Sequence, residues 1–400
     1  MTLPPRSQYA VVTAGYWAFT LSDGALRMLV LLHLQAVGRS PLELLAVLLP
    51  YEVAGVVTNL ASGYLGARLG LKATLVAGLV LQVAACAALA FETSWLTLPF
   101  VMSTQLVSGV AKDLTKTGAK SYVKLLAPAG NEGGLFRLVA LLTGSKNALK
   151  GLGFFVGGAS LGWLGFRGSM VALAVVLVAA AALTAMTLPP AVGRMKQKTG
   201  VTSIFAHEPW LNWLAAARLF LFGSRDAWFA VALPVFLVAD AGWSQAAASA
   251  FLASWVIGYG IVQALAPSLV RPSDASAGGR AVAVWTAFLI VPLIVAAWLL
   301  GGSIPPGLVL ATTLVVYGCV FAVASSLHSW LVLSHGDENV VLRVGFYYSA
   351  NAIGRVAGLA ASAILFAGAG EGRPGMQACL VGSAVAVLVA ALCSLPLRRG

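Results

Sequence analysis

The chain has 400 residues, of which 60% are hydrophobic and 10% are charged, and its mean hydropathy is +0.90. A soluble globular domain carries roughly 25% charged residues, so this composition excludes one. The formal net charge of +12 comes mainly from lysines and arginines between apolar runs. That placement indicates membrane orientation and makes nucleic-acid binding a poor explanation.

Apolar runs long enough to cross a bilayer, about 20 residues each, recur along the whole chain. Unsatisfied peptide groups in hydrocarbon cost several kcal/mol, so such runs must form helices or closed barrels. The strict alternation expected of a barrel is missing, and the sequence therefore predicts an all-α polytopic membrane protein with twelve helices. In chain order, the predicted spans cover residues 9–35, 42–66, 73–91, 95–112, 134–161, 168–189, 211–239, 245–270, 281–300, 307–333, 341–367 and 376–396.

A polar, basic stretch separates six predicted spans from six. We expect residues 1–190 to form an N-terminal six-helix half, 191–209 a cytoplasmic linker, and 210–400 a C-terminal six-helix half. Transporters built from two parallel repeats have this layout, and work by rocking of the halves about a site near the bilayer midplane.

Similar residues recur in the two predicted halves at nearly one offset. Asp226 follows Asp23 by 203 residues, and Asn351 follows Asn147 by 204. These matches predict pseudo-symmetric halves.

Positive charge near the span ends predicts which side faces the cytoplasm. With both termini cytoplasmic, fourteen Lys and Arg fall on the inner side and three on the outer side. We therefore expect a multi-pass protein of the cell (inner) membrane with both termini cytoplasmic. The inner set is Arg6, Arg68, Lys72, Lys112, Lys116, Lys120, Lys124, Arg194, Lys196, Lys198, Arg271, Arg280, Arg398 and Arg399, and the outer set is Arg39, Arg167 and Arg373.

The loop after the second span resembles the signature inner loop of the major facilitator superfamily, Gly-x3-Asp-Arg-x-Gly-Arg-Lys. Gly63, Arg68, Gly70 and Lys72 match it, and Ala67 stands where the family usually has Asp. Glycines permit a tight turn between close-packed helices. The four matching residues are candidates for an inner-loop gate, although the missing carboxylate puts the usual charge relay of this loop in doubt.

Charged residues inside the predicted spans are the strongest functional signal, because each costs some kcal/mol in the membrane and usually faces a cavity or a partner. Six basic and three acidic residues leave an excess of positive charge, which would favour a bound polyanion. The basic set is Arg27, Lys146, Lys150, Arg218, Arg225 and Arg355, and the acidic set is Asp23, Glu52 and Asp226.

Helical spacing places several of these residues on common faces. Lys146 and Lys150 are four apart and share one face of the fifth span. Tyr348, Asn351 and Arg355 share a face of the eleventh span. The predicted substrate-binding residues are Arg27, Lys146, Asn147, Lys150, Arg218, Arg225, Tyr348, Asn351 and Arg355.

Some of these charges also have a structural interpretation. Asp23 and Arg27, at i and i+4, could form a pair along one helix, and so could Arg225 with the adjacent Asp226. The acidic set supplies candidate proton-coupling groups, yet Glu52 could equally be a neutral buried acid held by a hydrogen bond. The sequence leaves these alternatives open.

The sequence lacks the residue patterns that catalysis or metal binding would need. The four cysteines stand singly in apolar spans, without metal-ligand spacing, and the four histidines are scattered. A receptor would normally carry a sizeable soluble domain, and no loop is long enough for one. We expect a monomeric transporter in the lipid bilayer, with a small anionic substrate and without catalytic residues, metal or other cofactor.

Seven stretches of the chain resemble one family, the ArsJ organoarsenical efflux permeases of the major facilitator superfamily. Together they span nearly the whole chain and include both predicted halves. They are residues 16–27 (YWAFTLSDGALR), 108–113 (SGVAKD), 142–155 (LTGSKNALKGLGFF), 217–223 (ARLFLFG), 255–267 (WVIGYGIVQALAP), 325–329 (SSLHS) and 345–355 (GFYYSANAIGR).

This resemblance implies the twelve-helix major facilitator fold and export of 1-arseno-3-phosphoglycerate. A glyceraldehyde-3-phosphate dehydrogenase makes that compound when arsenate replaces phosphate, and the compound releases arsenate once it is outside the cell. The resemblance therefore implies arsenate resistance and a functional partnership with the dehydrogenase. Another organophosphate or oxyanion, imported or exchanged, remains the alternative cargo, and uniport and proton antiport both stay open.

Overall fold

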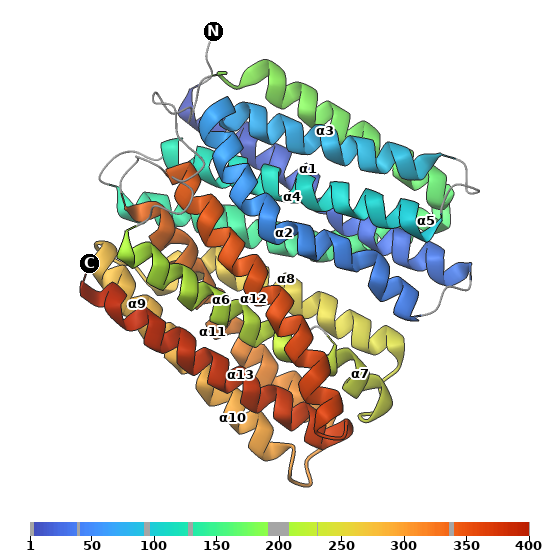
Figure 1. Cartoon of the computed structure of the whole chain (residues 1–400), viewed down its shortest axis with the longest axis vertical. Coiled ribbons are helices and arrows are strands. Elements are labelled where there is room, and N and C mark those ends of the chain that lie inside the picture. The colour runs from blue at the N-terminus through green and yellow to red at the C-terminus, as the bar shows by residue number, and fades with distance from the viewer. Residues whose placement is uncertain are drawn as a thin grey trace. The chain divides into compact units, whose positions relative to one another are not determined.

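The chain folds into helices throughout the part that the structure describes. In the computed structural model this part comprises residues 4–37, 41–91, 97–126, 131–190, 208–229, 231–335 and 340–399. Every regular element within these ranges is a helix (Figure 1). In chain order they are α1 (Pro5–Ala36), α2 (Pro41–Leu69), α3 (Leu71–Ala90), α4 (Leu98–Leu126), α5 (Glu132–Thr187), α6 (Pro209–Phe229), α7 (Ala232–Ala239), α8 (Gln245–Leu269), α9 (Ala275–Phe288), α10 (Ile290–Leu299), α11 (Pro306–Ser334), α12 (Val340–Gly368), α13 (Gly372–Ser394) and the 3-10 helix η3 (Leu395–Arg399).

Each of the twelve predicted spans overlaps a described helix, but the breaks between helices differ. The fifth and sixth predicted spans both lie in α5, where Gly165 has a non-helical backbone with φ of 65° that glycine adopts readily. The seventh predicted span is divided into α6 and α7, and the ninth into α9 and α10. By length and composition, eight helical segments of the described residues could cross a membrane.

The fourth predicted span is too short. It ends at residue 112, whereas α4 continues to Leu126. Lys112, Lys116 and Lys120, which the sequence analysis placed on the inner side at and beyond the end of this span, therefore all lie on one helix and are four residues apart. The prediction was wrong because lysines lower local hydropathy, while their unbranched side chains are well tolerated in a helix.

Contacts within the chain define two compact units, which we describe separately. The predicted division into sequential halves stays a prediction. Unit 1 is Met1–Gly130, Ser145–Ala206 and Gly336–Ser349, and unit 2 is Asn131–Gly144, His207–His335 and Ala350–Gly400.

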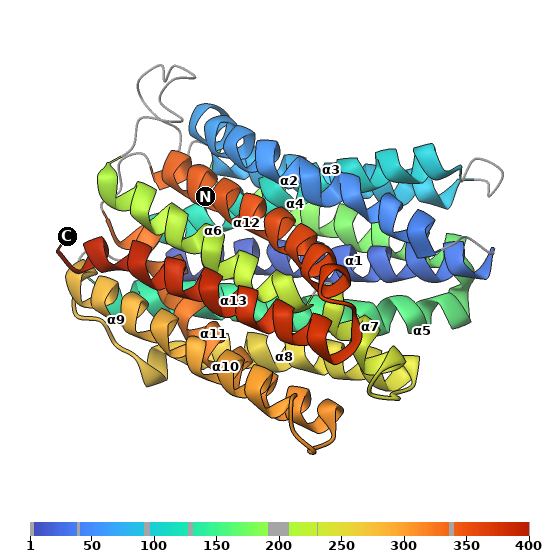
Figure 2. The ribbon, with the colours of Figure 1, turned by 60° about the horizontal axis from the view of Figure 1, so that its bottom comes forward.

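Close helix packing in unit 1 depends on small residues. Helix α4 packs against both α2 and α3 (Figures 1 and 2). A Cβ atom added at Gly109 of α4 would lie 2.8 Å from the carbonyl oxygen of Tyr51 on α2. A Cβ atom added at Gly153 of α5 would lie 2.6 Å from the carbonyl oxygen of Leu21 on α1. Glycines thus let backbones approach as they do in other membrane bundles, and this approach brings the charged residues of α1, α2, α4 and α5 together.

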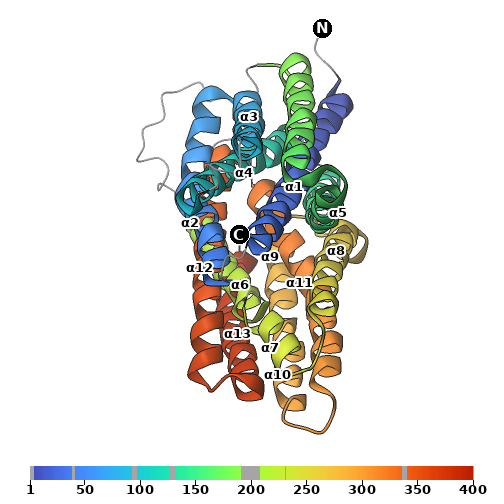
Figure 3. The same cartoon turned by 90° about the vertical axis from the view of Figure 1, so that its right-hand side faces the viewer.

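Unit 2 has a core of aromatic rings. Trp228 on α6 makes edge contacts with Trp255 on α8 and Tyr317 on α11, with centroids 5.7 and 5.4 Å apart. Helix α13 packs against α6, α9 and α10 (Figure 3). A Cβ atom added at Gly358 of α12 would lie 2.5 Å from the carbonyl oxygen of Gly223 on α6. This contact holds α12 close to the polar residues of α6.

Candidate substrate-binding site

A group of charged side chains surrounds Tyr51 in unit 1. Tyr51 is fully buried, and its hydroxyl donates a hydrogen bond to Oδ1 of Asp23 at 2.7 Å. The guanidinium carbon of Arg27 lies 3.7 Å from the centroid of the Tyr51 ring, and Nζ of Lys112 lies 3.9 Å from the same centroid. Cations at this range are attracted by the ring quadrupole. We define the Tyr51 cluster as Asp23, Arg27, Tyr51, Glu52, Lys112 and Lys150.

Both carboxylates of the Tyr51 cluster are ion-paired. Nη2 of Arg27 donates to Oε1 of Glu52 at 3.0 Å, and Nζ of Lys150 lies 3.7 Å from Oδ2 of Asp23. Two predicted proton-coupling candidates thus contact two predicted substrate ligands. Arg27 of α1 thus pairs with α2, and Asp23 of α1 pairs with α5. Both ion pairs join two different helices, so neither is a pair within one helix.

Three lysines follow one another along α4, and two of them approach Tyr348 of α12. We define the α4 lysine row as Lys112, Lys116 and Lys120. Nζ of Lys116 lies 4.7 Å from the Tyr348 ring centroid and Nζ of Lys120 lies 4.5 Å from it. Lys120 is buried and donates a hydrogen bond to the Tyr348 hydroxyl. Tyr348 was predicted to contact the substrate, whereas the lysines beside it were missed because they were assigned to a loop.

A third carboxylate, also missed by the sequence analysis, balances part of the lysine row. Asp113 is fully buried, accepts from Nζ of Lys116 at 2.8 Å, and accepts from Thr58 at 2.6 Å. The spacing of four along α4 is the signal that could have identified the row, once the helix is allowed to continue past residue 112.

The charged residues that the structure describes around Tyr51 and along α4 and α5 include more cations than carboxylates. Lys146 and Asn147 on α5 are half-buried and share the fifth-span segment with Lys150. The preceding residue, Ser145, accepts a hydrogen bond from Nε1 of Trp17 at 2.8 Å, which ties this part of α5 to α1. Among the Tyr51 cluster, the α4 lysine row, Asp113 and Lys146, six cations stand against three carboxylates, and each of these residues is buried or half-buried. The cations are Arg27, Lys112, Lys116, Lys120, Lys146 and Lys150, and the carboxylates are Asp23, Glu52 and Asp113.

Arg218 of α6 anchors a polar group in unit 2. It is 3% exposed, and its Nε donates to Oδ1 of Asn351 at 3.0 Å. Its Nη1 lies 3.2 Å from the carbonyl oxygen and 3.3 Å from Oγ of Ser325. The structure therefore brings two predicted ligands, Arg218 and Asn351, into direct contact. Tyr259 and Gln263 of α8 also donate to Oγ of Ser325, at 3.1 and 3.2 Å. The sequence analysis did not name them as site residues, although both lie in the stretch 255–267 that resembles the ArsJ permeases.

Asp226 is shared by two arginines of unit 2. Arg225 approaches Oδ1 with Nε at 2.7 Å and Nη2 at 2.5 Å, while Nε of Arg355 donates to Oδ2 at 3.1 Å. The pair of Arg225 with Asp226, which the sequence analysis left open, is thus present. Arg355 is a second partner of the same carboxylate. One carboxylate against two guanidinium groups leaves one positive charge in this group, and Arg218 adds another.

Of the predicted gate residues, Gly70 forms the turn between α2 and α3, while Gly63 and Arg68 lie in α2 and Lys72 lies in α3. Gly70 is the single residue between these helices and has φ of 95° and ψ of 157°, a region that is essentially restricted to glycine. A Cβ atom added at Gly63 would lie 3.0 Å from the carbonyl oxygen of Val341. Arg68 is exposed with its guanidinium 5.2 Å from the Tyr64 ring centroid, and Lys72 is half-buried at the start of α3. The tight turn is confirmed, and the gating role stays a prediction.

Comparison with known families decides the class of protein to which this helical chain belongs. Residues 12–358 match the model of the Major Facilitator Superfamily. The chain belongs to this superfamily. It is a multi-pass membrane transporter, and its family consists of transporters rather than enzymes.

Solved structures of superfamily members have the same fold. The chain superposes on the fucose:proton symporter FucP of E. coli with a TM-score of 0.74 at 14% identity, covering 98% of this chain and 99% of that chain. It superposes on the human organic anion transporter TETRAN with a TM-score of 0.74 at 16% identity, covering 98% and 100%. A bacterial homologue of the iron transporter ferroportin gives 0.75 at 14% identity, covering 98% and 100%. No curated protein sequence matches the chain.

These likenesses confirm the predicted fold class, an all-α polytopic protein with the major facilitator fold. At such low identity they establish the fold alone. The cargo has to be argued from the charged groups of each unit.

Proposed function

We propose that this transporter exports a small organic polyanion, 1-arseno-3-phosphoglycerate, by alternating access and thereby confers arsenate resistance. The supporting observation is a surplus of cations among the Tyr51 cluster, the α4 lysine row, Asp113 and Lys146 of unit 1, where six cations stand against three carboxylates. Charges in a membrane interior are rare and costly. A surplus of three therefore favours an anion that neutralises it when the anion binds.

The chemistry of the cargo suits these groups. The compound carries a phosphate and an arsenate-type ester, and both are anionic tetrahedral groups. Arginine offers forked donors to such oxyanions, whereas lysine supplies compact point charges. Lys112 and Lys120 lie over the rings of Tyr51 and Tyr348, and this attraction helps to hold both ammonium groups in place.

Export agrees with the electrical gradient of a cell. With an interior-negative potential, each negative charge that leaves is worth about 2.3 kcal/mol per 100 mV. Outward movement of a polyanion therefore needs no compulsory second ion. Proton antiport is the alternative, and Asp23, Glu52 and Asp226 are the candidate coupling groups.

The proposal includes the cell (inner) membrane as the location, both termini in the cytoplasm, and a glyceraldehyde-3-phosphate dehydrogenase as the functional partner. The ArsJ resemblance supports the arsenical as cargo. Another organophosphate or oxyanion is the second candidate, because the same cation surplus would favour it.

Transport into everted membrane vesicles tests the proposal. Vesicles with the cytoplasmic face outward receive the dehydrogenase, NAD, glyceraldehyde 3-phosphate and arsenate, and vesicle arsenic is measured. We expect accumulation only when all four components are present, and its loss in the Lys146→Gln variant. Arg280→Gln, at an exposed position on α9, is the matched control and should transport normally. Accumulation of arsenic from arsenate alone, or normal transport by Lys146→Gln, would contradict the proposal.

A further inference from the structure

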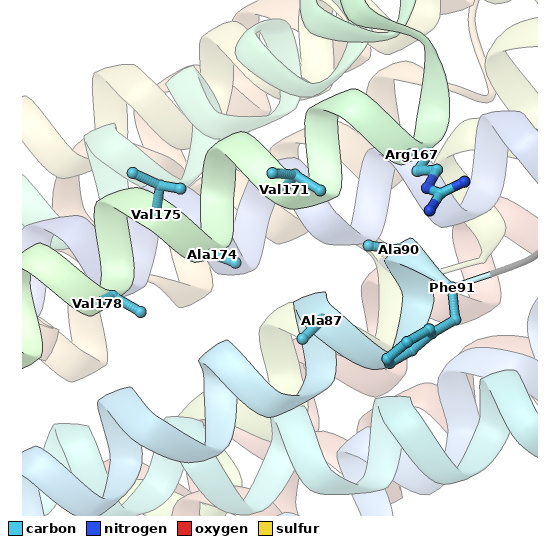
Figure 4. Close-up of a pocket in the computed structure, with 8 residues that line it drawn as sticks. All are labelled: Ala87, Ala90, Phe91, Arg167, Val171, Ala174, Val175 and Val178. Atoms are coloured by element: carbon cyan, nitrogen blue, oxygen red, sulfur yellow. The ribbon is translucent and has the colours of Figure 1, made fainter.

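A pocket of about 440 Å³ lies between α3 and the part of α5 that follows Gly165. Small residues make room for it, because Ala87 and Ala90 of α3 and Ala174 of α5 line its walls. Arg167 and Phe91 lie at one end of the pocket and Val178 lies at the other (Figure 4). Arg167 is the one charged residue among those that line it in the described part of the chain.

The charged end of this pocket has the residue types expected where a helix meets the membrane surface. Gly165, two residues before Arg167, interrupts the helix between the fifth and sixth predicted spans. Trp163 is 86% exposed and Leu164 is 55% exposed beside this break. Exposed tryptophan next to a basic residue is typical of the interface between lipid headgroups and hydrocarbon.

The length of the pocket fits one leaflet. Val178 follows Arg167 by eleven positions on α5, which corresponds to about 16 Å at 1.5 Å per residue. Half of the hydrocarbon core is about 15 Å thick. A pocket that starts at the interface and follows α5 therefore has the depth of one acyl chain.

We infer that this pocket binds a phospholipid with an anionic headgroup. The acyl chain lies along the alanines and valines of α3 and α5, and the phosphate accepts hydrogen bonds from the Arg167 guanidinium. Arginine recognises phosphate through two parallel donors. A zwitterionic lipid would bring its ammonium group near the same arginine, so the site should prefer phosphatidylglycerol to phosphatidylcholine.

Native mass spectrometry of the purified full chain tests this inference, with phosphatidylglycerol and phosphatidylcholine of identical acyl chains added separately. We expect one tightly retained phosphatidylglycerol. Arg167→Gln should weaken its binding about fivefold, since a basic residue near the surface contributes about 1 kcal/mol to anionic lipid binding, and should leave phosphatidylcholine unaffected. Arg137→Gln removes an exposed arginine of α5 outside the pocket and is the matched control.

A second variant tests the acyl chain. Ala174→Phe fills the pocket and should abolish the retained lipid, whereas Val176→Phe, at an exposed position of α5 that does not line it, should not. Equal binding of both lipids to the wild type would overturn the inference. Retention of the lipid by the Ala174→Phe variant would also overturn it. If the wild type is a dimer and Ala174→Phe converts it to monomers, the inference is overturned as well, because a second copy of the chain would then occupy the pocket. The surface substitution Arg167→Gln keeps the test valid if Ala174→Phe fails to fold.

Discussion

Replacing Lys150 and Asp23 separately and together distinguishes an anion ligand from a structural ion pair. Nζ of Lys150 lies 3.7 Å from Oδ2 of Asp23, which is longer than the 2.7–2.9 Å of a charge-assisted hydrogen bond. At this range the attraction is about 4 kcal/mol for an effective dielectric constant of 20, before desolvation offsets part of it. We expect Lys150→Gln to lower the free energy of unfolding by about 1–3 kcal/mol, because it leaves the carboxylate without this partner.

The double variant Asp23→Asn/Lys150→Gln removes both charges together. In the wild type the Tyr51 hydroxyl lies 2.7 Å from Oδ1 of Asp23, and the amide oxygen of the introduced asparagine can still accept this hydrogen bond. Most of the lost stability should therefore return, because neither charge is left alone.

Transport should respond differently from stability. A hydrogen bond to a charged group is worth about 1.5–3 kcal/mol, so losing the Lys150 ammonium should raise KM for the polyanion roughly 10- to 150-fold. If Lys150 binds the substrate, the double variant stays impaired although it is stable. The assay is arsenic uptake by everted vesicles, normalised to the amount of folded protein. A double variant with wild-type KM would refute the reasoning, since it would show that Lys150 only neutralises Asp23.

Three further changes give graded outcomes. Lys120→Gln should raise KM about tenfold because it removes one charge of the α4 lysine row. The amount of protein in the membrane should not change. An unchanged KM would exclude this row from the site. Arg218→Lys should impair transport although the charge is kept, since a lysine cannot bond Asn351 and Ser325 through one planar fork, and normal kinetics would contradict this. Gly70→Ala should destabilise the protein by about 1–3 kcal/mol because its backbone lies in a region restricted to glycine, which thermal unfolding measures; an unchanged unfolding temperature would show that the turn relaxes.

The sequence predicted the fold well because hydrophobic length and the glycine turn are local signals. All twelve spans overlap helices, and Gly70 occupies the turn that its residue type suggested. The end of α4 was missed because the charges of Lys112, Lys116 and Lys120 lower the local hydropathy. A hydropathy profile carries no information on the side chains that pack around these lysines. Tyr348 lies 228 residues beyond Lys120, and no local pattern links them.

Pairing partners were the part of the candidate site that the sequence left undecided. The spacing of Asp23 and Arg27 allowed a pair along α1, yet the structure matches Arg27 with Glu52 of α2. Likewise, Asp226 pairs with its neighbour Arg225 and also with Arg355 of α12. Which charged residues pair depends on which helices pack together. In this protein, close packing depends on glycines that contact segments far away in the sequence.

Ligand-induced stabilisation of the purified protein tests the central claim, that surplus cations within the helices bind a polyanion. A ligand at a hundred times its Kd adds about 2.7 kcal/mol to the free energy of unfolding, which a thermal unfolding curve resolves. We predict that 2,3-bisphosphoglycerate, a stable compound with two phosphate groups, raises the unfolding temperature of the wild type, whereas glycerol does not. The Lys146→Gln variant should lose this response. Equal stabilisation by glycerol, or a full response in that variant, would contradict the account.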